Sequence, residues 1–387
     1  MSRFLVMIGR ANLCLILFCL SLGLVGCVHM TTTKDKPVEI QLVKSSFDDL
    51  NQWGYDTQYE ALQAFKRSCK IFIRQDPDQP ISNLTRLGGK VQDWVAPCKD
   101  VLDSKITNSD LARKFFERWF IPYLVKDITG TSTGKFTGYY EIELRGSLKK
   151  TKKYQHPVYA CPQDIDIIRG TSSISHRAIN NGALKNKGLE LVYVDNKARL
   201  LFMHIQGSGI VHLAGGGQMK LGYACKNGHP YLAIGPLFKD YAKTRIHSGV
   251  DMMHWLHTNP KEATELTEQN QSYVFFKQIH GETPIGGQGI PLTAERSMAI
   301  DYKLYPYGVP MWLETESPKI DALPSIPYNR LMIAQDTGGA IKGAIRGDIF
   351  YGRGKIAEKL ACTMNKSGLY YVLFPKTVFV PSVYKSN

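Results

Sequence analysis

The chain of 387 residues is 43% hydrophobic, and its 48 lysines and arginines outnumber its 34 acidic residues to give a net charge of +14. This composition supplies enough apolar material for one large domain or two medium domains with buried cores. The positive charge would attract an anionic polymer such as nucleic acid, acidic lipid or cell-wall glycopeptide. The basic residues are spread along the chain without a zinc finger, RNP-type segment or basic heptad region, so nucleic acid is not an expected partner.

The N-terminus has the layout of a secretory signal. Arg3 and Arg10 come before an apolar run over residues 13–25, which is short for a membrane span. A buried N-terminal helix is the alternative, but the cations ahead of the run are typical of an exported chain. We therefore predict a signal peptide over residues 1–26.

The apolar run ends in the sequence Leu-Val-Gly-Cys at residues 24–27, which resembles the lipobox of bacterial lipoproteins. In such proteins the signal is cleaved before the cysteine, and several acyl chains on the cysteine anchor the protein firmly. We therefore expect lipidation of Cys27 and membrane attachment through this lipid anchor. Val28, not aspartate, follows Cys27, which by analogy with such lipoproteins favours the periplasmic face of the outer membrane.

An odd number of cysteines remains after the signal and the lipidation site, so at least one thiol is free. These cysteines are Cys69, Cys98, Cys161, Cys225 and Cys362. In an oxidising periplasm a bridge from Cys69 to Cys98 is a reasonable expectation, because it would close one moderate loop in the N-terminal helical region. The spacing leaves the other pairings open.

Residues 27–44 are expected to form a tether between the lipid and the folded body, because this stretch is largely polar and lacks periodicity. The body begins near Ser45 with two amphipathic helices. Asp56 is expected to cap the first, and the second starts near Ser109. The apolar positions of these helices are Leu62, Phe65, Cys69 and Phe72 in the first, and Leu111, Phe115 and Trp119 in the second.

Beyond Thr133 the sequence changes to short β-branched and aromatic runs separated by glycine and proline, which predicts a mainly β fold with peripheral helices. Two helices interrupt the pattern, one capped by Ser248 and one opened by Pro260, and a third is expected over residues 356–364. Strands are predicted over residues 135–144, 155–160, 189–194, 198–205, 273–279, 309–314, 330–334, 348–351 and 369–380.

Three aspartates lie where apolar strands begin or end. Asp336 ends an apolar strand, a glycine pair then lets the backbone turn sharply, and Asp348 opens the next strand. Asp301 lies shortly before another predicted strand, so the chain brings acids together at strand ends. The alternative is that each aspartate only satisfies backbone amides of its own turn, the commonest role of a loop aspartate.

The set of Asp301, Asp336 and Asp348 in these settings resembles the three-aspartate barrel module of the membrane-bound lytic murein transglycosylase A family. Other segments resemble this family in the same order, and the resemblance covers most of the chain beyond the tether. These segments are Phe136-Thr137-Gly138-Tyr139-Tyr140, Gln206-Gly207-Ser208-Gly209, Gly222-Tyr223-Ala224, Lys226-Asn227-Gly228-His229-Pro230-Tyr231 and Tyr273-Val274-Phe275-Phe276-Lys277.

The resemblance implies a double-psi β-barrel domain formed by residues 45–141 and 282–387. A second β domain, residues 142–281, would be inserted into it, in agreement with the strand-rich middle of the chain. A groove between the two domains would hold a glycan strand.

The resemblance also implies that Asp348 is the catalytic acid and that Asp336, Asp301 and Thr137 are its neighbours. Asp348 would protonate the leaving oxygen of the β-1,4 bond between N-acetylmuramic acid and N-acetylglucosamine, then accept the proton of the muramyl 6-hydroxyl as a 1,6-anhydro ring closes. The first step requires a protonated Asp348, so we expect burial or the charge of Asp336 to raise its pKa. Alternatively, Asp336 orients Asp348 through a bridging polar group.

Six residues of the resembling segments are expected to bind substrate: Tyr139, Gln206, Gly207, Ser208, Tyr223 and Lys226. The tyrosines would stack on sugar faces and the lysine would meet a muramyl carboxylate, although aromatic residues on strands are more often core or cross-strand pairs. The glutamine and serine would bind hydroxyl or acetamide groups, but a Gly-Ser-Gly sequence is equally a simple turn.

The sequence predicts no metal site and no cofactor. The cysteines lack the paired spacing of a metal knuckle, and His254 and His257 share a helix face without an accompanying carboxylate motif. The expected partners are peptidoglycan glycan strands, the membrane through the lipid anchor and other wall-remodelling proteins, and the chain is expected to be a monomer.

Two rival functions are compatible with parts of the pattern. The sequence Asp336-Thr337-Gly338 after an apolar strand is also typical of aspartic proteases, but such enzymes need two loops of this kind and the chain has no second copy. The other rival is a non-catalytic wall-binding lipoprotein, which predicts that Asp348→Ala leaves murein turbidity unaffected.

Overall fold

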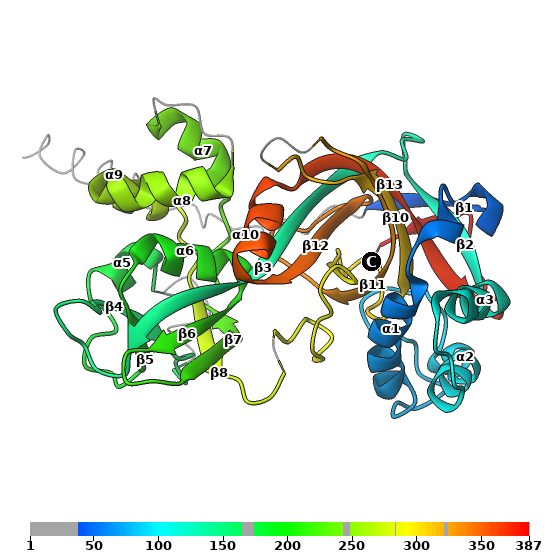
Figure 1. The fold of residues 1–387 in the computed structure, drawn as a ribbon, viewed down its shortest axis with the longest axis horizontal. Helices are drawn as coiled ribbons and strands as arrows, with labels where there is room; N and C mark the ends of the chain where they lie inside the picture. Colours follow the sequence, from blue (N-terminus) through cyan, green and yellow to red (C-terminus); the bar gives the residue numbers. More distant parts are fainter. Residues whose placement is uncertain (1–37, 165–173, 243–247, 283, 321–323, 387) are drawn as a thin grey trace, which may run out of the picture. The chain divides into compact units, whose positions relative to one another are not determined.

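Strand β3 (Gly134–Ser147) connects two groups of strands (Figure 1). The computed structural model describes residues 38–164, 174–242, 248–282, 284–320 and 324–386. In this part of the chain, 14 strands hydrogen-bond into one continuous sheet. The first half of β3 pairs with β12 (Arg346–Arg353) in parallel, and its second half pairs with β6 (Ser208–Leu213), also in parallel.

The first group of strands contains both ends of the described chain. Its order is β14-β1-β2-β13-β10-β11-β9-β12-β3, so the N-terminal strands β1 and β2 lie between the C-terminal strands β14 and β13. The remaining members are β1 (Glu39–Lys44), β2 (Phe120–Asp127), β9 (Ser297–Ala299), β10 (Pro310–Glu316), β11 (Pro327–Asp336), β13 (Asn365–Pro375) and β14 (Val383–Lys385).

The core of this group is formed by strands that are buried along most of their length. In β11, the run from Leu331 to Gln335 is buried at every position, and β13 is buried from Tyr370 to Pro375. Such continuous apolar runs are typical of strands covered on both faces. The sheet can therefore hold polar groups at the ends of these strands in fixed positions.

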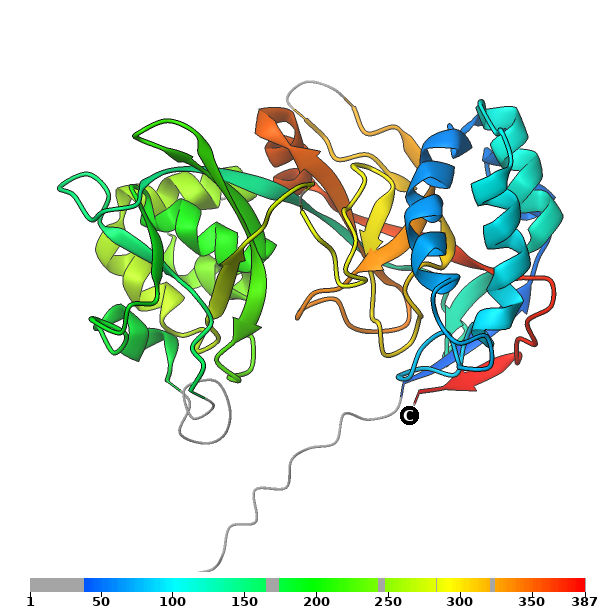
Figure 2. The ribbon, with the colours of Figure 1, turned by 90° about the horizontal axis from the view of Figure 1, so that it is seen from below.

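Three helices cover part of this core: α1 (Gln58–Phe72), α2 (Val91–Asp103) and α3 (Ser109–Trp119) (Figure 2). Helix α1 buries Phe65 against Phe116 and Phe120, with ring centroids 5.9 and 5.7 Å away. The predicted bridge is confirmed, because Cys69 in α1 is disulfide-bonded to Cys98 in α2. Two short 3-10 turns, η1 (Phe47–Asp49) and η2 (Trp53–Tyr55), precede α1.

Two expectations for the N-terminal region are wrong. Residues Glu39–Lys44 are not tether but strand β1, which pairs with β2 and β14 and buries Ile40 and Leu42. Asp56 does not cap α1. It accepts two hydrogen bonds of 2.9 Å from the buried Arg296 guanidinium and one of 2.9 Å from the Leu331 backbone amide. Asp56 therefore links the segment before α1 to strand β11.

In the sequence, the second group of strands lies between the N-terminal and the C-terminal strands of the first group. It contains the second half of β3, β6, β4 (His156–Tyr159), β5 (Glu190–Val194), β7 (Gln218–Lys226) and β8 (Val274–Gln278). Helices also contribute to this part of the chain, in addition to the strands expected there. They are α5 (His176–Asn180), α6 (Lys197–Gln206), α7 (Ile234–Tyr241), α8 (Gly249–Thr258) and α9 (Pro260–Thr267).

The predicted strand over residues 198–205 is wrong, because this run is helix α6. Asn196 begins the helix by accepting a hydrogen bond from the Arg199 amide, and Gly207 ends it with a left-handed φ of 78°. A continuous apolar run does not distinguish a buried strand from a helix, whereas these two flanking residues do. The helices expected from Ser248 and Pro260 are confirmed as α8 and α9, and the one near Ile356 as α10 (Gly354–Thr363).

Cys161 and Cys225 form a second disulfide that the sequence left open, and Cys362 makes none. The predicted mainly β fold with helices is confirmed. Among the described residues, every helix is too short or too polar to cross a lipid bilayer. The predicted signal peptide and Cys27 lie outside the described residues.

Candidate active site

Asp348 and Thr137 lie opposite each other on the parallel strands β12 and β3. The Thr137 hydroxyl donates a 2.5 Å hydrogen bond to Asp348 Oδ1, and Thr137 Oγ1 accepts a 2.7 Å hydrogen bond from Arg346 Nη2. Because the Thr137 oxygen accepts from a cation, its single proton is committed to Asp348. Strand register therefore fixes the orientation of this carboxyl group.

The environment of Asp348 favours the protonated acid. Burial raises its pKa to about 6, while the Arg346 cation and the Thr137 hydrogen bond oppose the shift and the charge of Asp336 adds to it. Burial therefore dominates, as a low-dielectric setting penalises the charged form. An acid with this pKa keeps a substantial protonated fraction near neutral pH and still ionises readily, as a group that donates and then accepts a proton must.

Asp336, at the end of β11, is held differently. Its Oδ1 accepts 2.8 Å hydrogen bonds from the backbone amides of Gly287 and Thr337, and its Oδ2 accepts a 2.6 Å hydrogen bond from the Tyr139 hydroxyl. Burial raises its pKa, and these three donors oppose that shift by favouring the carboxylate. The two acids thus have distinct surroundings, the usual basis for distinct roles of paired carboxylates.

Two glycines allow the loop before β9 to reach Asp336. A Cβ at Gly287 would collide with the Tyr307 hydroxyl, and a Cβ at Gly286 would come within 2.5 Å of the Gln335 carbonyl oxygen. Only a residue without a side chain lets the Gly287 amide approach Asp336 this closely.

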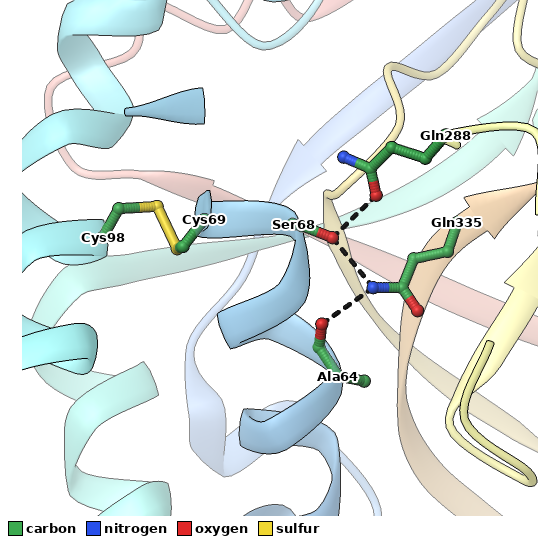
Figure 3. The surroundings of a disulfide bond; sticks show 6 residues. All are labelled: Ala64, Ser68, Cys69, Cys98, Gln288 and Gln335. Carbon is green, nitrogen blue, oxygen red and sulfur yellow. Dashed lines mark hydrogen bonds between the residues drawn. A yellow bond between two sulfur atoms is a disulfide. The ribbon is translucent and has the colours of Figure 1, made fainter. Parts of the chain in front are cut away.

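A buried polar network supports the same loop from behind (Figure 3). The Ser68 hydroxyl donates a 2.7 Å hydrogen bond to Gln288 Oε1 and accepts one of 2.8 Å from Gln335 Nε2. Gln335 also donates to the Ala64 carbonyl at 2.8 Å. Since Gln335 precedes Asp336 and Gln288 follows Gly287, helix α1 fixes both chain neighbours of this hydrogen-bonded pair. The sequence prediction missed this network, although Gln335 is a polar residue in an otherwise apolar strand.

Asp301 serves the loops next to Asp336. Its Oδ2 accepts a 2.9 Å hydrogen bond from the Gly343 amide, its Oδ1 accepts one of 3.2 Å from Lys303, and the Lys342 ammonium lies 3.7 Å away. The side chain is only 4% exposed. These contacts agree with the alternative hypothesis, in which a loop aspartate accepts hydrogen bonds from backbone amides. Asp301 thereby holds the loop that follows Asp336.

Tyrosines from both groups of strands lie around the aspartates. Tyr231 is close to the turn after β11, because a Cβ added at Gly339 would lie 3.7 Å from the Tyr231 Cβ, and burial followed by the charge of Asp348 raises the Tyr231 pKa. Tyr302 and Tyr307 stack with ring centroids 6.2 Å apart at 14°. Burial and the charge of Asp336 raise the pKa of Tyr307, which places this ring beside the acid.

The match to sequence families decides the identity of the chain. Residues 135–277 match the model described as the MltA specific insert domain, and residues 296–374 match the 3D domain. The Burkholderia pseudomallei lytic transglycosylase LtgG is 32% identical in sequence, with 87% of this chain and 96% of that chain covered and a TM-score of 0.60. The chain belongs to the membrane-bound lytic murein transglycosylase A (MltA) family.

Other relatives agree with this assignment. The membrane-bound lytic murein transglycosylase A of Escherichia coli K12 is 33% identical over 244 residues, which cover 62% of this chain and 65% of that protein, slightly less than two thirds. A membrane-bound lytic murein transglycosylase from Agrobacterium tumefaciens has a TM-score of 0.75 at 28% identity, with 87% and 98% covered. E. coli MltA with bound chitohexaose has a TM-score of 0.66 at 26% identity, with 87% and 94% covered.

The structure places the other expected site residues in this MltA family member as follows. Gln206 Oε1 accepts a 2.9 Å hydrogen bond from the Tyr140 amide, Gly207 ends α6 and Ser208 begins β6, so these three residues build the junction between α6 and β6. Tyr139 is 8% exposed and its hydroxyl is held by Asp336, which gives it an orienting contact in place of a free sugar-binding face.

Tyr223 and Lys226 remain accessible on β7. Tyr223 is 50% exposed, and burial followed by the charge of Tyr302 raises its pKa. Lys226 is exposed at the end of the strand. Sequence reasoning missed Gly287, whose amide donates to Asp336, and Arg346, which donates to Thr137. Within the described ranges, no three His, Cys, Asp or Glu residues are grouped to hold a metal ion.

Proposed function

We propose that this protein is a lytic transglycosylase that cleaves the β-1,4 bond between N-acetylmuramic acid and N-acetylglucosamine in peptidoglycan. The observation that carries the proposal is Asp348, a carboxyl group with a pKa of about 6 that is oriented by Thr137 and lies within the electrostatic reach of Asp336. The relatives named as murein transglycosylases support the substrate class, and the bound chitohexaose of the E. coli relative supports a sugar ligand.

The proposed reaction needs one proton at Asp348. The protonated carboxyl group donates this proton to the glycosidic oxygen while the bond from that oxygen to C1 of the muramyl residue breaks. The ionised Asp348 then accepts the proton of the muramyl 6-hydroxyl as its oxygen bonds to C1. The product carries a 1,6-anhydro end, and no water is consumed, so a single acid suffices where a hydrolase needs a pair.

In this reaction Asp336 acts as a positioning residue with a fixed negative charge. Three hydrogen-bond donors keep its carboxylate in place, and its charge raises the pKa of Asp348. The same charge would stabilise positive charge that develops on the sugar ring as the C1 bond breaks. Asp301 and Thr137 support this arrangement, one through the loop after Asp336 and the other directly at Asp348.

We further propose that the exposed Tyr223 and Lys226, with Tyr231 and Ser208, bind the glycan, with the rings stacking on sugar faces and Lys226 meeting the muramyl carboxylate. The proposed architecture is a double-psi β-barrel of residues 45–141 and 282–387 with residues 142–281 inserted. The matched segment 135–277 and the two groups of strands joined by β3 support it. The proposed location, the periplasmic face of the outer membrane, rests on the lipobox at Cys27.

Mass analysis of the products released from purified murein tests the function. The wild type should release 1,6-anhydro muropeptides, and Asp348→Asn should release none while still binding murein. Asp78→Asn, at an exposed carboxylate ion-paired with Lys90, is the matched control and should behave as wild type. Products with reducing muramyl ends would instead identify a hydrolase, and peptide cleavage that a statine-type inhibitor blocks would identify an aspartic protease. Clearing by Asp348→Asn at the normal rate would overturn the proposal.

A further inference from the structure

A cavity of about 640 Å³ lies in the second group of strands and helices, and its lining residues lie between positions 150 and 273. Neither Asp336 nor Asp348 lines it, so this cavity is separate from the candidate active site. Its volume falls in the range of pockets that hold small molecules or short peptides. Nothing in the proposed transglycosylase reaction uses it.

His204 belongs to the lining of this cavity, and among the described residues neither of its two buried ring nitrogens has a hydrogen-bond partner. The Val274 backbone is nearby but makes no hydrogen bond of normal geometry with the ring. Burial and the neighbouring His176 lower the His204 pKa to about 3, so the imidazole is neutral. A neutral imidazole offers one donor and one acceptor, which matches a peptide group or a hydroxyl of a ligand.

Two exposed lysines, Lys150 and Lys197, lie at the cavity and carry positive charge toward it. His156 belongs to the same lining, and burial followed by the charges of Lys197 and Lys150 lowers its pKa, with Asp195 opposing. Lys197 also donates a 3.0 Å hydrogen bond to Thr264.

Within the described ranges, the acidic residues at the cavity do not cancel this charge. Asp195 is ion-paired with Arg145 at 3.1 Å, and the nearby Glu268 is ion-paired with Arg177 at 3.0 Å. Glu190 is the other carboxylate of the lining, which also contains Lys185. The surroundings of Lys150 and Lys197 therefore favour an anionic ligand.

Another part of the wall is apolar and aromatic. Tyr273 is 4% exposed and its ring lies 4.4 Å from that of His204, and leucine side chains of α6 complete this part of the lining. A ligand that satisfies all three regions carries a carboxylate, a peptide group and an aliphatic portion. An acidic peptide has this combination, whereas an uncharged sugar lacks the carboxylate.

We propose that this cavity, called here the Lys150–Lys197 cavity, is a second binding site that takes the acidic stem peptide of peptidoglycan. The proposal rests on the proposed function, because a murein-cleaving enzyme meets glycan strands that carry such peptides. The peptide carboxylates bind Lys150 and Lys197, and a peptide group binds His204. A site of this kind positions the glycan strand by its peptide, through contacts that are separate from those to the sugars at Asp348.

Calorimetric titration of the full chain in detergent with a free stem tetrapeptide tests the site. The peptide should bind, the same peptide with its carboxylates amidated should bind at least tenfold more weakly, and Lys150→Gln with Lys197→Gln should weaken binding by about tenfold or more. Both lysines are exposed, so this double variant should fold, and an unchanged near-UV spectrum checks this. Lys114→Gln, at an exposed lysine on α3, is the matched control and should bind as wild type.

A second measurement locates the peptide. Histidine ring NMR signals of the full chain should show a shift of His204 on addition of the tetrapeptide and none on addition of chitohexaose. Equal affinity of the double variant and the wild type, or binding without a change at His204, would overturn the site. Because peptide binding is measured without bond cleavage, the two proposals can fail separately. If the protein clears murein but does not bind the peptide, only the second site is wrong. If it binds the peptide but forms no anhydro ends, only the proposed function is wrong.

Discussion

The Thr137 hydroxyl donates to Asp348 Oδ1 at 2.5 Å while its oxygen accepts from Arg346 Nη2 at 2.7 Å. This relay links the acid to a cation without direct contact between the two charges. It keeps one face of the carboxyl group occupied and leaves the other oxygen for a proton. The pKa of Asp348, about 6, follows from burial working against this relay.

Replacement of Thr137 by valine should lower the maximal rate of murein clearing by about tenfold, the value of one hydrogen bond to a charged group. The lost bond favoured the ionised form, so the Asp348 pKa should rise. Activity needs the protonated acid and falls as pH rises through this pKa, so the alkaline limb of the rate profile should move to higher pH. Thr137→Ser keeps the hydroxyl, so the alkaline limb of its rate profile should lie at the wild-type pH. If the alkaline limb of the valine variant also lies at the wild-type pH, the hydrogen bond from Thr137 has no electrostatic role.

Replacement of Asp348 by asparagine should stabilise the folded protein at pH 7. A carboxyl group whose folded pKa is raised to about 6 contributes stability below the unfolded pKa near 3.8, and this is lost as pH rises through the folded pKa. The neutral amide avoids the loss, which amounts to about 1–3 kcal/mol. Thermal unfolding at pH 4 and pH 7 measures it, and the Asn variant should gain on the wild type as pH increases. A constant difference between the two proteins would contradict the raised pKa.

Ser68→Ala tests the polar network behind the active site. The change leaves Gln288 Oε1 without its donor and removes an acceptor of Gln335, so the free energy of unfolding should fall by about 1–3 kcal/mol. The loop that carries Gly287 should then hold Asp336 less firmly, and the rate constant of cleavage should fall more than the Michaelis constant changes. Ser68→Thr keeps the hydroxyl and should restore part of the rate.

Ser104 provides the matched control for this network. Its hydroxyl is buried after α2 and makes no hydrogen bond in the described part of the chain, so Ser104→Ala should be nearly neutral. If Ser68→Ala lowers stability but leaves the cleavage rate and its pH profile as in the wild type, the network is structural only.

Arg296→Leu should destabilise the protein by about 3–5 kcal/mol, because it leaves the carboxylate of Asp56 buried without its partner. Both side chains of this pair are nearly inaccessible, at 1% and 4% exposure. Arg118→Leu, at an arginine 70% exposed and 3.7 Å from Asp100, should change stability by less than about 1 kcal/mol. Denaturant unfolding compares the two, and equal effects would argue against the buried pair as an anchor of β11.

Several parts of this arrangement were predictable from local sequence patterns. The apolar strand that ends in Asp336 is observed, and Asp348 lies in the next strand, which begins two residues earlier than predicted, at Arg346. The contact of Gly287 with Asp336 and that of Ser68 with Gln335 were not predictable, because the segments that carry Gly287 and Ser68 give no sign of them in the sequence. Strand β1 was missed although its alternating burial of Ile40 and Leu42 has the period of a strand. Helix α2 was missed, and it contains Pro97.

Helix α6 shows that apolar composition alone does not distinguish a helix from a strand. Its run of apolar residues has no clear period, and strands and helices bury such runs equally well. The information that decides between them lies outside the run, in Asn196 and Gly207. Sequence reasoning that weighs the flanking residues before the run itself would have predicted the helix.

The pairing of β3 with β12 also has a consequence for how the protein matures. Thr137 and Asp348 are 211 residues apart in the sequence. Strand β1 likewise cannot complete its pairing until β14, near residue 385, has been synthesised. Long-range pairings of this kind form slowly, since a large loop must close first. The strands and helices between them involve shorter loops and can pack earlier. A chain emerging from its N-terminus thus carries no assembled acid until β12 has been made, so the proposed lytic activity would be withheld through most of synthesis.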